Sequence, residues 1–313
     1  MGAVEHIVVT GARGFLGRTI VRRALAQGHQ VTAIMRTAPE SDPGCTVLVH
    51  DLAQIEPDDL AGKLQGATAI IHAAGEMTSD SARHARSTLP ATRVVAKAAQ
   101  TLGAHLVHIS SISVYDYRAI DEGGFVSETS PIEPDPQTRD GYVAAKIDQE
   151  ALIGTHCPDA TVLRVGALYG AGRVWNAHLG PTLGPVLLRL SARGQIPLSH
   201  VDTCAAIAVQ AASLRKSGAI NVTDLDLPTR TRFLSAVTKS GWPKLIVPLP
   251  WKALLTLGGL LAPWRGRPGL LRAGVLHARI KPVGFDTTRL ERSFDVPPRS
   301  FEGQMKEALS HEP

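Results

Sequence analysis

The chain has little cysteine and few aromatic residues. Its three cysteines, Cys45, Cys157 and Cys204, lie far apart in 313 residues and lack metal-ligand spacing, so we expect free thiols and no bound metal. Aromatic residues make up 4% of the chain, and the lysines and arginines are dispersed although the net charge is +5. Nucleic-acid sites usually combine a continuous basic surface with stacking aromatic side chains. We therefore expect no nucleic-acid partner.

A long unbroken apolar run is absent as well. The longest apolar segment, residues 245–264, is interrupted by Pro248, Pro250, Lys252 and Pro263, so it is a poor candidate for a membrane-spanning helix. The chain opens on a strand pattern rather than on the apolar core of a signal peptide. Hydrophobic residues make up 44% of the chain, which is typical of a globular protein. These features predict a cytoplasmic protein.

What the chain does contain is a glycine-rich turn between a strand and a helix. The apolar residues of 4–9 lead into Gly11, Gly14 and Gly17, and residues 19–26 have helical spacing. Gly11 suits a tight turn, Gly14 lets a pyrophosphate approach bare main chain, and Gly17 lets the helix pack closely against the strand. The unpaired N–H groups at a helix N-terminus bind phosphate. The turn therefore predicts a dinucleotide site, although three glycines alone would also fit an ordinary turn.

Two arginines bear on which dinucleotide is bound. NAD sites usually place an acidic residue after the second strand, whereas a cation there accommodates the 2′-phosphate of NADP. Here the second strand, residues 30–35, ends at Arg36, which has no acidic neighbour in the sequence, and Arg13 in the glycine turn could reach the same phosphate. We therefore expect NADP(H); the alternative is an arginine that only faces solvent. Asp51, after a third strand at residues 46–50, could accept a hydrogen bond from the adenine amino group or form a turn.

Strands and helices alternate along the first half of the chain. Helices are expected over residues 81–102 and from about residue 139, and further strands at residues 67–72, 104–109 and 161–165. This alternation predicts an α/β protein with a doubly wound parallel (Rossmann) sheet. A polar, proline-rich loop at residues 116–137 is long enough to serve as a lid or a substrate wall.

The pattern loosens from residue 166, where glycine, proline and tryptophan become frequent. We expect helices at residues 185–192 and 203–214 and a strand at residues 219–222. The chain is thus divided into an NADP-binding Rossmann domain, residues 1–165, and a smaller C-terminal substrate-binding lobe, residues 166–313, parts of which return to the main sheet.

Tyr142 and Lys146 are the second strong signal. Four residues apart on a helix, their side chains lie on one face, about one turn from each other. A phenol is a poor base at neutral pH, but a neighbouring cation lowers its pKa and lets it exchange a proton with a substrate oxygen. Ser111, at the end of a predicted strand, could hold the same oxygen. A tyrosine and a lysine at this spacing also occur as ordinary surface pairs.

These motifs together resemble the short-chain dehydrogenase/reductase superfamily, in its extended, epimerase/dehydratase-like branch, over nearly the whole chain. The matching segments are TGARGFLG (10–17), HAAG (72–75), SSISVY (110–115), YVAAK (142–146), LRVGALYG (163–170), HVD (200–202) and FEG (301–303). The resemblance implies that Tyr142 is the catalytic acid/base, that Lys146 lowers its pKa and binds the nicotinamide ribose, and that Ser111 orients the substrate. Ser111 is chosen because the family's serine or threonine lies four residues before the tyrosine matched by Tyr115.

The expected cofactor-binding residues come from the turn, the strand ends and this resemblance. They are Gly11, Arg13, Gly14, Phe15, Leu16, Gly17, Arg36, Asp51, Leu52, Ala73, Ala74, Tyr142 and Lys146.

The chain also departs from the family pattern. Members that act on sugar nucleotides usually carry an asparagine where this chain has Gly166 and Ala167, and an arginine where it has residues 197–199, Pro-Leu-Ser. Losing these side chains removes charge-assisted anchors for a nucleotide pyrophosphate. The Asp-Glu pair of dehydratases is absent after Ser111, and Thr88 replaces an asparagine that members often carry, which puts an inherited proton relay in doubt.

The sequence therefore predicts an NADP(H)-dependent carbonyl reductase or alcohol dehydrogenase for a small, mostly apolar ketone or alcohol. The alternatives are a nucleotide-sugar epimerase or dehydratase and, outside catalysis, a dinucleotide-sensing protein. The apolar segment at residues 245–272 could line the substrate pocket, pack in the core, or form an amphipathic helix at a membrane surface. The resemblance also implies a homodimer through a four-helix contact that includes the Tyr142 helix.

Overall fold

A parallel sheet between two layers of helices forms most of the molecule. The computed structural model describes residues 4–41, 44–174, 177–238, 241–262 and 269–310. Its seven-stranded sheet has the order β12-β7-β5-β4-β1-β2-β3, and every neighbouring pair is parallel. The strands are β1 (His6–Thr10), β2 (Gln30–Met35), β3 (Thr46–Val49), β4 (Ala69–His72), β5 (His105–Ser111), β7 (Thr161–Val165) and β12 (Gly218–Val222). The predicted doubly wound Rossmann sheet is confirmed.

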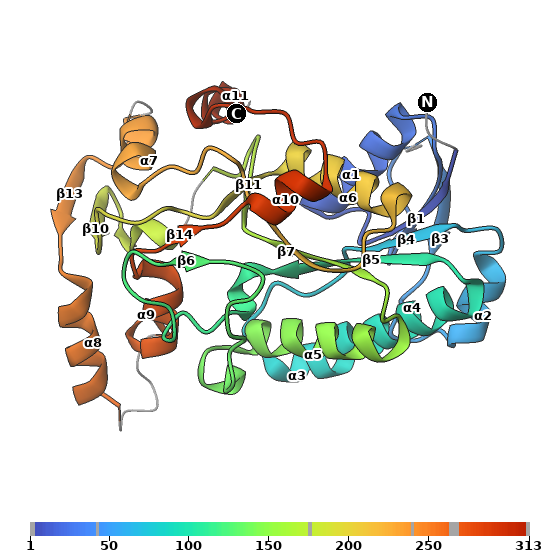
Figure 1. Ribbon diagram of the computed structural model, residues 1–313, viewed down its shortest axis with the longest axis horizontal. Helices are drawn as coiled ribbons and strands as arrows, with labels where there is room; N and C mark the ends of the chain where they lie inside the picture. Colours follow the sequence, from blue (N-terminus) through green and yellow to red (C-terminus); the bar gives the residue numbers. More distant parts are fainter. Residues whose placement is uncertain (1–3, 42–43, 175–176, 239–240, 263–268, 311–313) are drawn as a thin grey trace.

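Helices cover both faces of this sheet (Figure 1). On one face lie α1 (Phe15–Ala26), α6 (Val201–Leu214) and α10 (Thr288–Ser293); on the other lie α2 (Pro57–Lys63), α3 (Ser81–Arg83), α4 (Leu89–Leu102) and α5 (Gly141–His156). Central strands buried on both sides must be apolar on both sides, and Ile7, Val8 and Val9 of β1 are all fully buried. Strand order reverses between β1 and β4, and in such sheets ligands bind at the carboxyl ends of the strands at that point.

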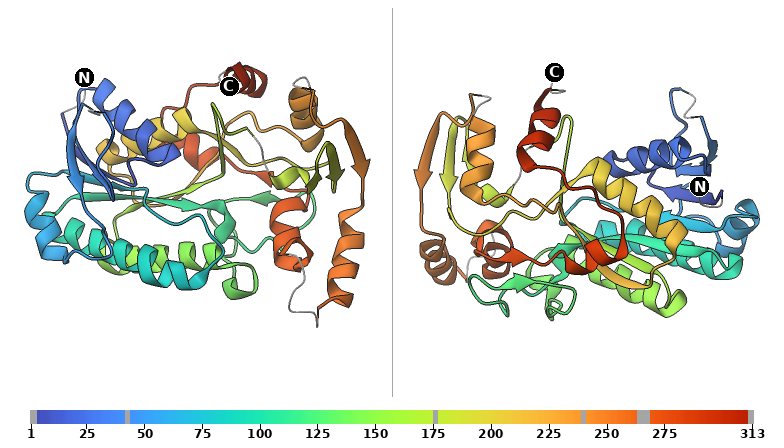
Figure 2. Two further views of the ribbon diagram at one scale, coloured as in Figure 1. Left: turned by 180° about the vertical axis from the view of Figure 1, so that it is seen from behind. Right: turned by 45° about the horizontal axis from the view of Figure 1, so that its top comes forward.

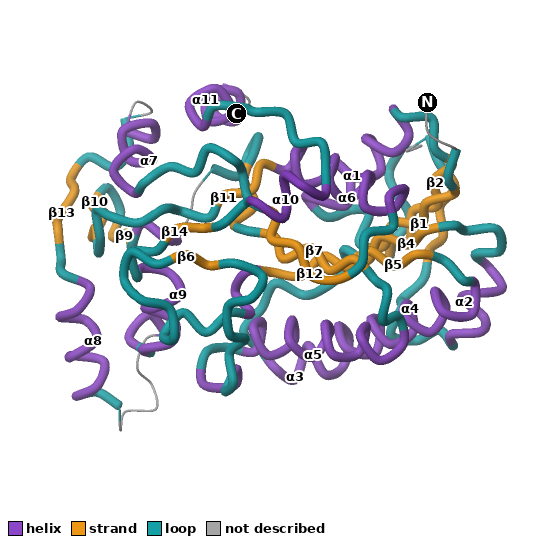
Figure 3. The backbone as a smooth tube through the Cα atoms, viewed as in Figure 1, coloured by secondary structure: helices purple, strands orange, loops and turns teal. Residues whose placement is uncertain are grey.

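Small sheets and short helices lie at the end of the molecule away from β3 (Figures 2 and 3). The strands there are β6 (Phe125–Val126), β8 (Ala167–Tyr169), β9 (Thr182–Leu183), β10 (Val186–Arg189), β11 (Leu198–His200), β13 (Leu245–Pro248) and β14 (Gly284–Phe285). The helices there are α7 (Arg230–Val237), α8 (Trp251–Leu260), α9 (Ala273–Ile280) and α11 (Phe301–Ser310). Tyr169, Leu187, Phe233 and Phe301 belong to a buried cluster of their own.

The helix expected at residues 185–192 is wrong, because this segment contains β10. Val186 and Leu188 are half-buried whereas Leu187 is fully buried, which is the two-residue alternation of a strand rather than the period of a helix. Pairing of β10 with β9 and β13 supplies the main-chain hydrogen bonds. Tertiary pairing thus overrides the helix preference of leucine.

The helix expected over residues 81–102 is interrupted. Between α3 and α4 lies a five-residue π turn, His84–Thr88. Pro90, in the first turn of α4, has no N–H to donate to the preceding turn. The wider turn places His84 and Thr88 in the lining of a cavity that Tyr142 also lines.

Candidate active site

The glycine turn after β1 has no room for side chains at two of its three glycines. A Cβ on Gly17 would lie 2.1 Å from the main-chain oxygen of Gly11, and a Cβ on Gly11, whose φ is +67°, would lie 2.9 Å from the main chain of Ala73. Gly14 is the N-cap of α1 and supplies no capping side chain, and the first turn of α1 has no acidic residue. The exposed N–H groups at this helix start therefore suit a diphosphate.

Two joined cavities extend from this turn along the carboxyl edge of the sheet. The first has a volume of about 640 Å³ and the second about 670 Å³, and both are lined by Gly11, Gly14 and Ala73. Of the predicted site residues, the first cavity is also lined by Arg13, Arg36, Asp51, Leu52 and Ala74. The second is also lined by Phe15, Leu16, Gly17, Ser111, Tyr142 and Lys146. The fold thus brings all the predicted residues to one continuous cleft.

The two arginines expected at the NADP phosphate both lie in the first cavity. Arg13 donates a hydrogen bond to the Thr37 hydroxyl. Arg36 does have an acidic neighbour in space, which the sequence did not indicate: its Nη1 lies 3.2 Å from a carboxylate oxygen of Glu76. Arg83 lies 2.9 Å from the other oxygen of that carboxylate. Glu76 therefore holds Arg36 against the loop after β4.

Asp51 forms a turn and lines the first cavity at the same time. Its Oδ1 accepts a hydrogen bond from the Ala53 N–H at 3.0 Å, which is the turn alternative considered from the sequence. Asp51 also lines the first cavity. Leu52, which follows it, is buried beside Ile34 in the sheet layer.

Ser111, Tyr142 and Lys146 meet in the second cavity. Ser111 ends β5, and its Oγ accepts a hydrogen bond from the Ser113 N–H at 3.2 Å. Asp140 caps the N-terminus of α5 by accepting from the Val143 N–H at 3.0 Å, which fixes the helix that carries Tyr142 and Lys146. Lys146 Nζ lies 5.9 Å from the centre of the Tyr142 ring.

The expected lowering of the Tyr142 pKa is not what the structure shows. Burial raises the pKa of Tyr142 above its usual value, and it outweighs the lowering by a hydrogen bond with Ser111 and by the charge of Arg173. Lys146 Nζ instead donates to the main-chain oxygen of Ile109 at 2.8 Å. Burial lowers the pKa of Lys146 to about 8, against a smaller opposing effect of Glu150. Tyr142 is therefore protonated at neutral pH.

The neighbouring serines have other partners. Ser110 donates to a carboxylate oxygen of Glu150, and Glu150 also forms an ion pair with Arg164 at 2.7 Å. The Ser113 hydroxyl is buried and has no hydrogen-bond partner among the described residues. Of the three, Ser111 is the one whose hydroxyl lowers the pKa of Tyr142.

A buried polar layer supports the helix side of the second cavity. His72 is hydrogen-bonded to the hydroxyls of Thr10 at 2.9 Å and Thr92 at 3.1 Å. Gln149 donates to the same Thr92 hydroxyl at 2.7 Å. Burial and the charge of Lys146 lower the pKa of His72 to about 3, so its ring is neutral and serves to position its neighbours.

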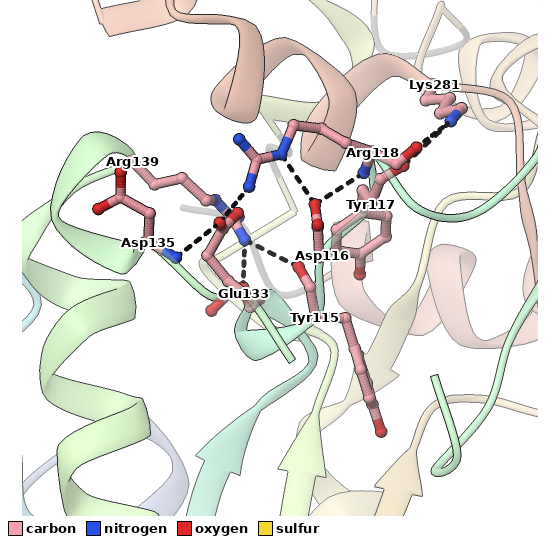
Figure 4. Close-up of polar contacts among 9 residues, drawn as sticks. Tyr115, Asp116, Tyr117, Arg118, Glu133, Asp135, Arg139 and Lys281 are labelled. Atoms are coloured by element: carbon pink, nitrogen blue, oxygen red, sulfur yellow. Dashed lines mark hydrogen bonds and ion pairs between the residues drawn. The ribbon is translucent and has the colours of Figure 1, made fainter. Parts of the chain in front are cut away.

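Arg139 anchors the segment that follows β5 (Figure 4). Its guanidinium is buried and donates to the main-chain oxygens of Ser113 at 2.6 Å and Tyr115 at 3.0 Å. Arg118 forms an ion pair with the buried Glu133 beside it. Because Arg139 also lines the second cavity, this network connects the predicted lid segment to the site.

Several residues that line the second cavity were missed from the sequence: Glu76, His84, Arg139, Arg173 and Arg279. Asp140 could have been predicted as the N-cap of α5, since an aspartate before an apolar helix is a common N-cap. That prediction would have placed Arg139, its neighbour, at the start of the helix that carries Tyr142. His84 lies in the π turn, which no residue pattern in the sequence predicts. Arg173 and Arg279 come from segments far apart in the chain.

Neither a metal site nor a membrane-crossing helix is found in the described part of the chain. No three histidines, cysteines or acidic residues come close enough there to bind a metal ion together. Among the helices in the described ranges, none has the length and apolar character needed to cross a bilayer.

The chain matches known proteins along most of its length. A ceramide reductase of Caulobacter vibrioides is 27% identical over 268 residues, covering 82% of this chain and 78% of that protein. A 3-diazoavenalumate denitrifying reductase of Streptomyces is 28% identical over 265 residues, covering 78% and 86% of the two chains. The structure of MoeE5 in complex with UDP-glucose and NAD superimposes with a TM-score of 0.71 at 18% identity over 98% of both chains, a likeness of fold. Residues 7–221 match the NAD dependent epimerase/dehydratase family, and the chain therefore belongs to that family of nicotinamide-dinucleotide enzymes.

Proposed function

We propose that the protein is an NADP(H)-dependent carbonyl reductase or alcohol dehydrogenase for a small, mostly apolar ketone or alcohol. The observation that carries this proposal is that Ser111, Tyr142 and Lys146 line one cavity that also reaches the glycine turn. Two reductases among its relatives support it.

The chain's own residues have distinct roles in this reaction. A bound NADPH would supply the hydride. Tyr142, protonated at neutral pH because burial raises its pKa, donates a proton to the substrate oxygen, and Ser111 donates a hydrogen bond to that oxygen. Lys146 gives a fixed positive charge behind Tyr142, which stabilises the phenolate that proton donation leaves. Oxidation of an alcohol reverses each of these steps.

The preference for NADP(H) rests on Arg13 and Arg36. Both residues line the first cavity, Arg13 from the glycine turn and Arg36 directly after β2, where the family's cofactor ribose would bind. The pairing of Arg36 with Glu76 leaves it 69% exposed, so it can also bind a phosphate.

A nucleotide-sugar epimerase or dehydratase is the second candidate, favoured by the fold shared with MoeE5. The packing at Gly166 disfavours it, because a Cβ there would lie 2.3 Å from the main-chain oxygen of Pro197. The asparagine of sugar-nucleotide members has no space at that position. Ser199, close by, is fully buried and bonded to the main chain of Gly166 and Val222.

We place the protein in the cytoplasm, divide it at residues 165 and 166 into a nucleotide domain and a substrate lobe, and expect a homodimer through α4 and α5. Light scattering of the purified protein measures the last point directly.

The central test is NADPH oxidation followed at 340 nm with a panel of apolar ketones and aldehydes. We expect substrate-dependent turnover, and Tyr142→Phe should lower kcat by about 10²- to 10⁴-fold, as expected for loss of a general acid. NADPH affinity, measured by fluorescence titration, should stay within about threefold. Full activity of Tyr142→Phe would refute the assigned role. Tightly retained cofactor without net turnover would favour the epimerase, and NADPH binding without any turnover would favour a dinucleotide sensor.

A further inference from the structure

The small sheet β13-β10-β9 has one apolar face that no element of the described residues covers. Val186 pairs with Leu183 and with Leu245, and Leu188 pairs with Val247; paired residues point to the same side of a sheet. Leu187 and Ile246 point to the opposite side, where they join the buried cluster. On the outer side Leu183 is 66%, Leu245 55% and Val247 37% exposed. The solvent side of such a sheet normally carries polar residues.

Helix α8 also carries exposed leucines. It follows β13 directly, and in Figures 1 and 2 the two form the outermost layer at the end of the molecule away from β3. One side of α8 packs on α9, with Trp251 buried against Leu276 and Ile280. Leu257 and Leu260 on the same helix are 43% and 75% exposed. We call Leu183, Val186, Leu188, Leu245, Val247, Leu257 and Leu260 the outer face.

The sequence segments that form the outer face contain no acidic residue. Residues 160–201 and 227–285, which contain all of its elements, include fourteen lysines and arginines and no aspartate or glutamate. Lys244 is exposed next to Leu245. Lys252, 68% exposed, forms an ion pair with Glu122 at 2.8 Å, so one acid from another segment reaches the edge of this region. Arg164 and Arg232 among the fourteen are likewise paired with acids from other segments, and Arg230 is buried.

This combination selects one kind of partner. A second copy of the chain would bring like charges together at the outer face, and like charges repel. An anionic phospholipid surface attracts lysine and arginine and also accepts aliphatic side chains at the boundary between its headgroups and acyl chains. We infer that the outer face docks the protein onto the surface of a membrane that contains anionic phospholipid, without any segment crossing it.

The docked surface lies close to the second cavity. Helix α9, on which α8 packs, contributes Ala278 and Arg279 to the cavity wall. A substrate that partitions into the membrane would thus reach the site past a single helix. The docking itself does not depend on the proposed reductase activity.

The test is co-sedimentation of the full chain with large vesicles. Vesicles of equal parts phosphatidylglycerol and phosphatidylcholine should bind the protein, vesicles of phosphatidylcholine alone should bind it at least tenfold more weakly, and 0.5 M NaCl should reduce binding to the anionic vesicles. The double variant Leu245→Glu/Leu260→Glu should bind the anionic vesicles at least tenfold more weakly than the native chain.

The matched control is Val4→Glu/Leu214→Glu, which makes the same charge change at exposed apolar positions, 71% and 50% exposed, outside the outer face. It should retain most of the binding. Leu183→Glu/Leu257→Glu gives a second variant of the outer face if the first fails to fold, as judged by circular dichroism and thermal melting. Three results would overturn the inference: no preference for anionic vesicles, equal loss in the control variant, or a dimer of the native chain that Leu245→Glu/Leu260→Glu dissociates.

Discussion

Lys146 Nζ lies 2.8 Å from the main-chain oxygen of Ile109 and donates a hydrogen bond to it. The bond ties the middle of α5 to β5 just before Ser111, the partner of Tyr142. It also keeps an ammonium group in a site where burial lowers its pKa to about 8. The charge that the proposed reaction uses is therefore held in place at a cost to the free energy of the folded state.

Replacing this lysine by an apolar side chain should raise stability at neutral pH. Below pH 8 Lys146 is charged in both the folded and the unfolded chain, and the folded chain bears the full burial penalty. A fall in pKa from 10.5 to about 8 corresponds to roughly 3 kcal/mol. We expect the free energy of unfolding of Lys146→Met to exceed that of the native chain by up to this amount at pH 7.

The difference should have a definite pH dependence. Between pH 8 and 10.5 the unfolded native chain binds more protons, so its stability rises with pH and the advantage of Lys146→Met shrinks. Urea unfolding at pH 7 and pH 10 measures both values. The exposed Lys97→Met on α4 should show no such trend. If Lys146→Met were less stable than the native chain by the same amount at both pH values, the hydrogen bond to Ile109 would contribute more free energy than burial of the ammonium group costs.

The glycine turn yields a prediction about folding. A Cβ at Gly17 would lie 2.1 Å from the Gly11 oxygen, a distance that neither main chain can relieve without moving α1 off the sheet. Gly17→Ala should therefore melt at a temperature at least 8 °C lower, or fail to fold, given a loss of about 3 kcal/mol. Gly154, in α5, has nothing within 4 Å of its Cβ position, so Gly154→Ala should gain about 0.5–1 kcal/mol. Similar melting temperatures for the two variants would contradict the close packing.

The sequence was enough to locate the sheet and most of the cleft. Strands β2 and β7 lie at the predicted residues. A short run of β-branched and aliphatic residues between turns is typical of a buried strand in an α/β chain. The glycine turn and the Tyr142 helix each depend on residues close together in the chain. Local pattern therefore suffices for them.

What the sequence did not give depends on contacts between distant segments. The partner of Arg36 is Glu76, 40 residues away in a loop, and no local pattern links the two. The direction of the Tyr142 pKa shift depends on how deeply α5 packs, which spacing alone does not reveal. Residues 185–192 contain a strand rather than a helix because β13, more than fifty residues later, pairs with it.

Cofactor selectivity should depend on the two arginines of the first cavity. Charge-assisted hydrogen bonds contribute about 1.5–3 kcal/mol each, or roughly 10- to 150-fold in affinity. Arg13→Ala/Arg36→Ala should raise the KM for NADPH by at least tenfold and change that for NADH less than threefold. Arg22→Ala, an exposed arginine of α1 paired with Asp202 at 3.1 Å, is the control. If the double variant keeps its ratio of NADPH to NADH efficiency, the arginines do not bind a 2′-phosphate.

Asp224 should make stability depend on pH in the acid range. It is buried, accepts hydrogen bonds from the Tyr169 hydroxyl at 2.8 Å and the His200 N–H at 2.9 Å, and has its pKa raised by burial from 3.8 to about 6. Its folded form binds more protons than its unfolded form between these values. The stability that this group contributes is therefore complete below pH 4 and is lost as the pH rises through 6. The loss amounts to roughly 3 kcal/mol.

Asp224→Asn removes this titration while keeping an acceptor for His200 and a partner for Tyr169. Its free energy of unfolding should fall less between pH 4.5 and pH 7.5 than that of the native chain, so that the variant is relatively more stable at the higher pH. Asp59→Asn, on the exposed side of α2, controls for the change in net charge. Urea titrations at several pH values measure the slopes. Parallel slopes for Asp224→Asn and the native chain would show that the carboxyl group is ionised throughout, with its two hydrogen bonds compensating the burial.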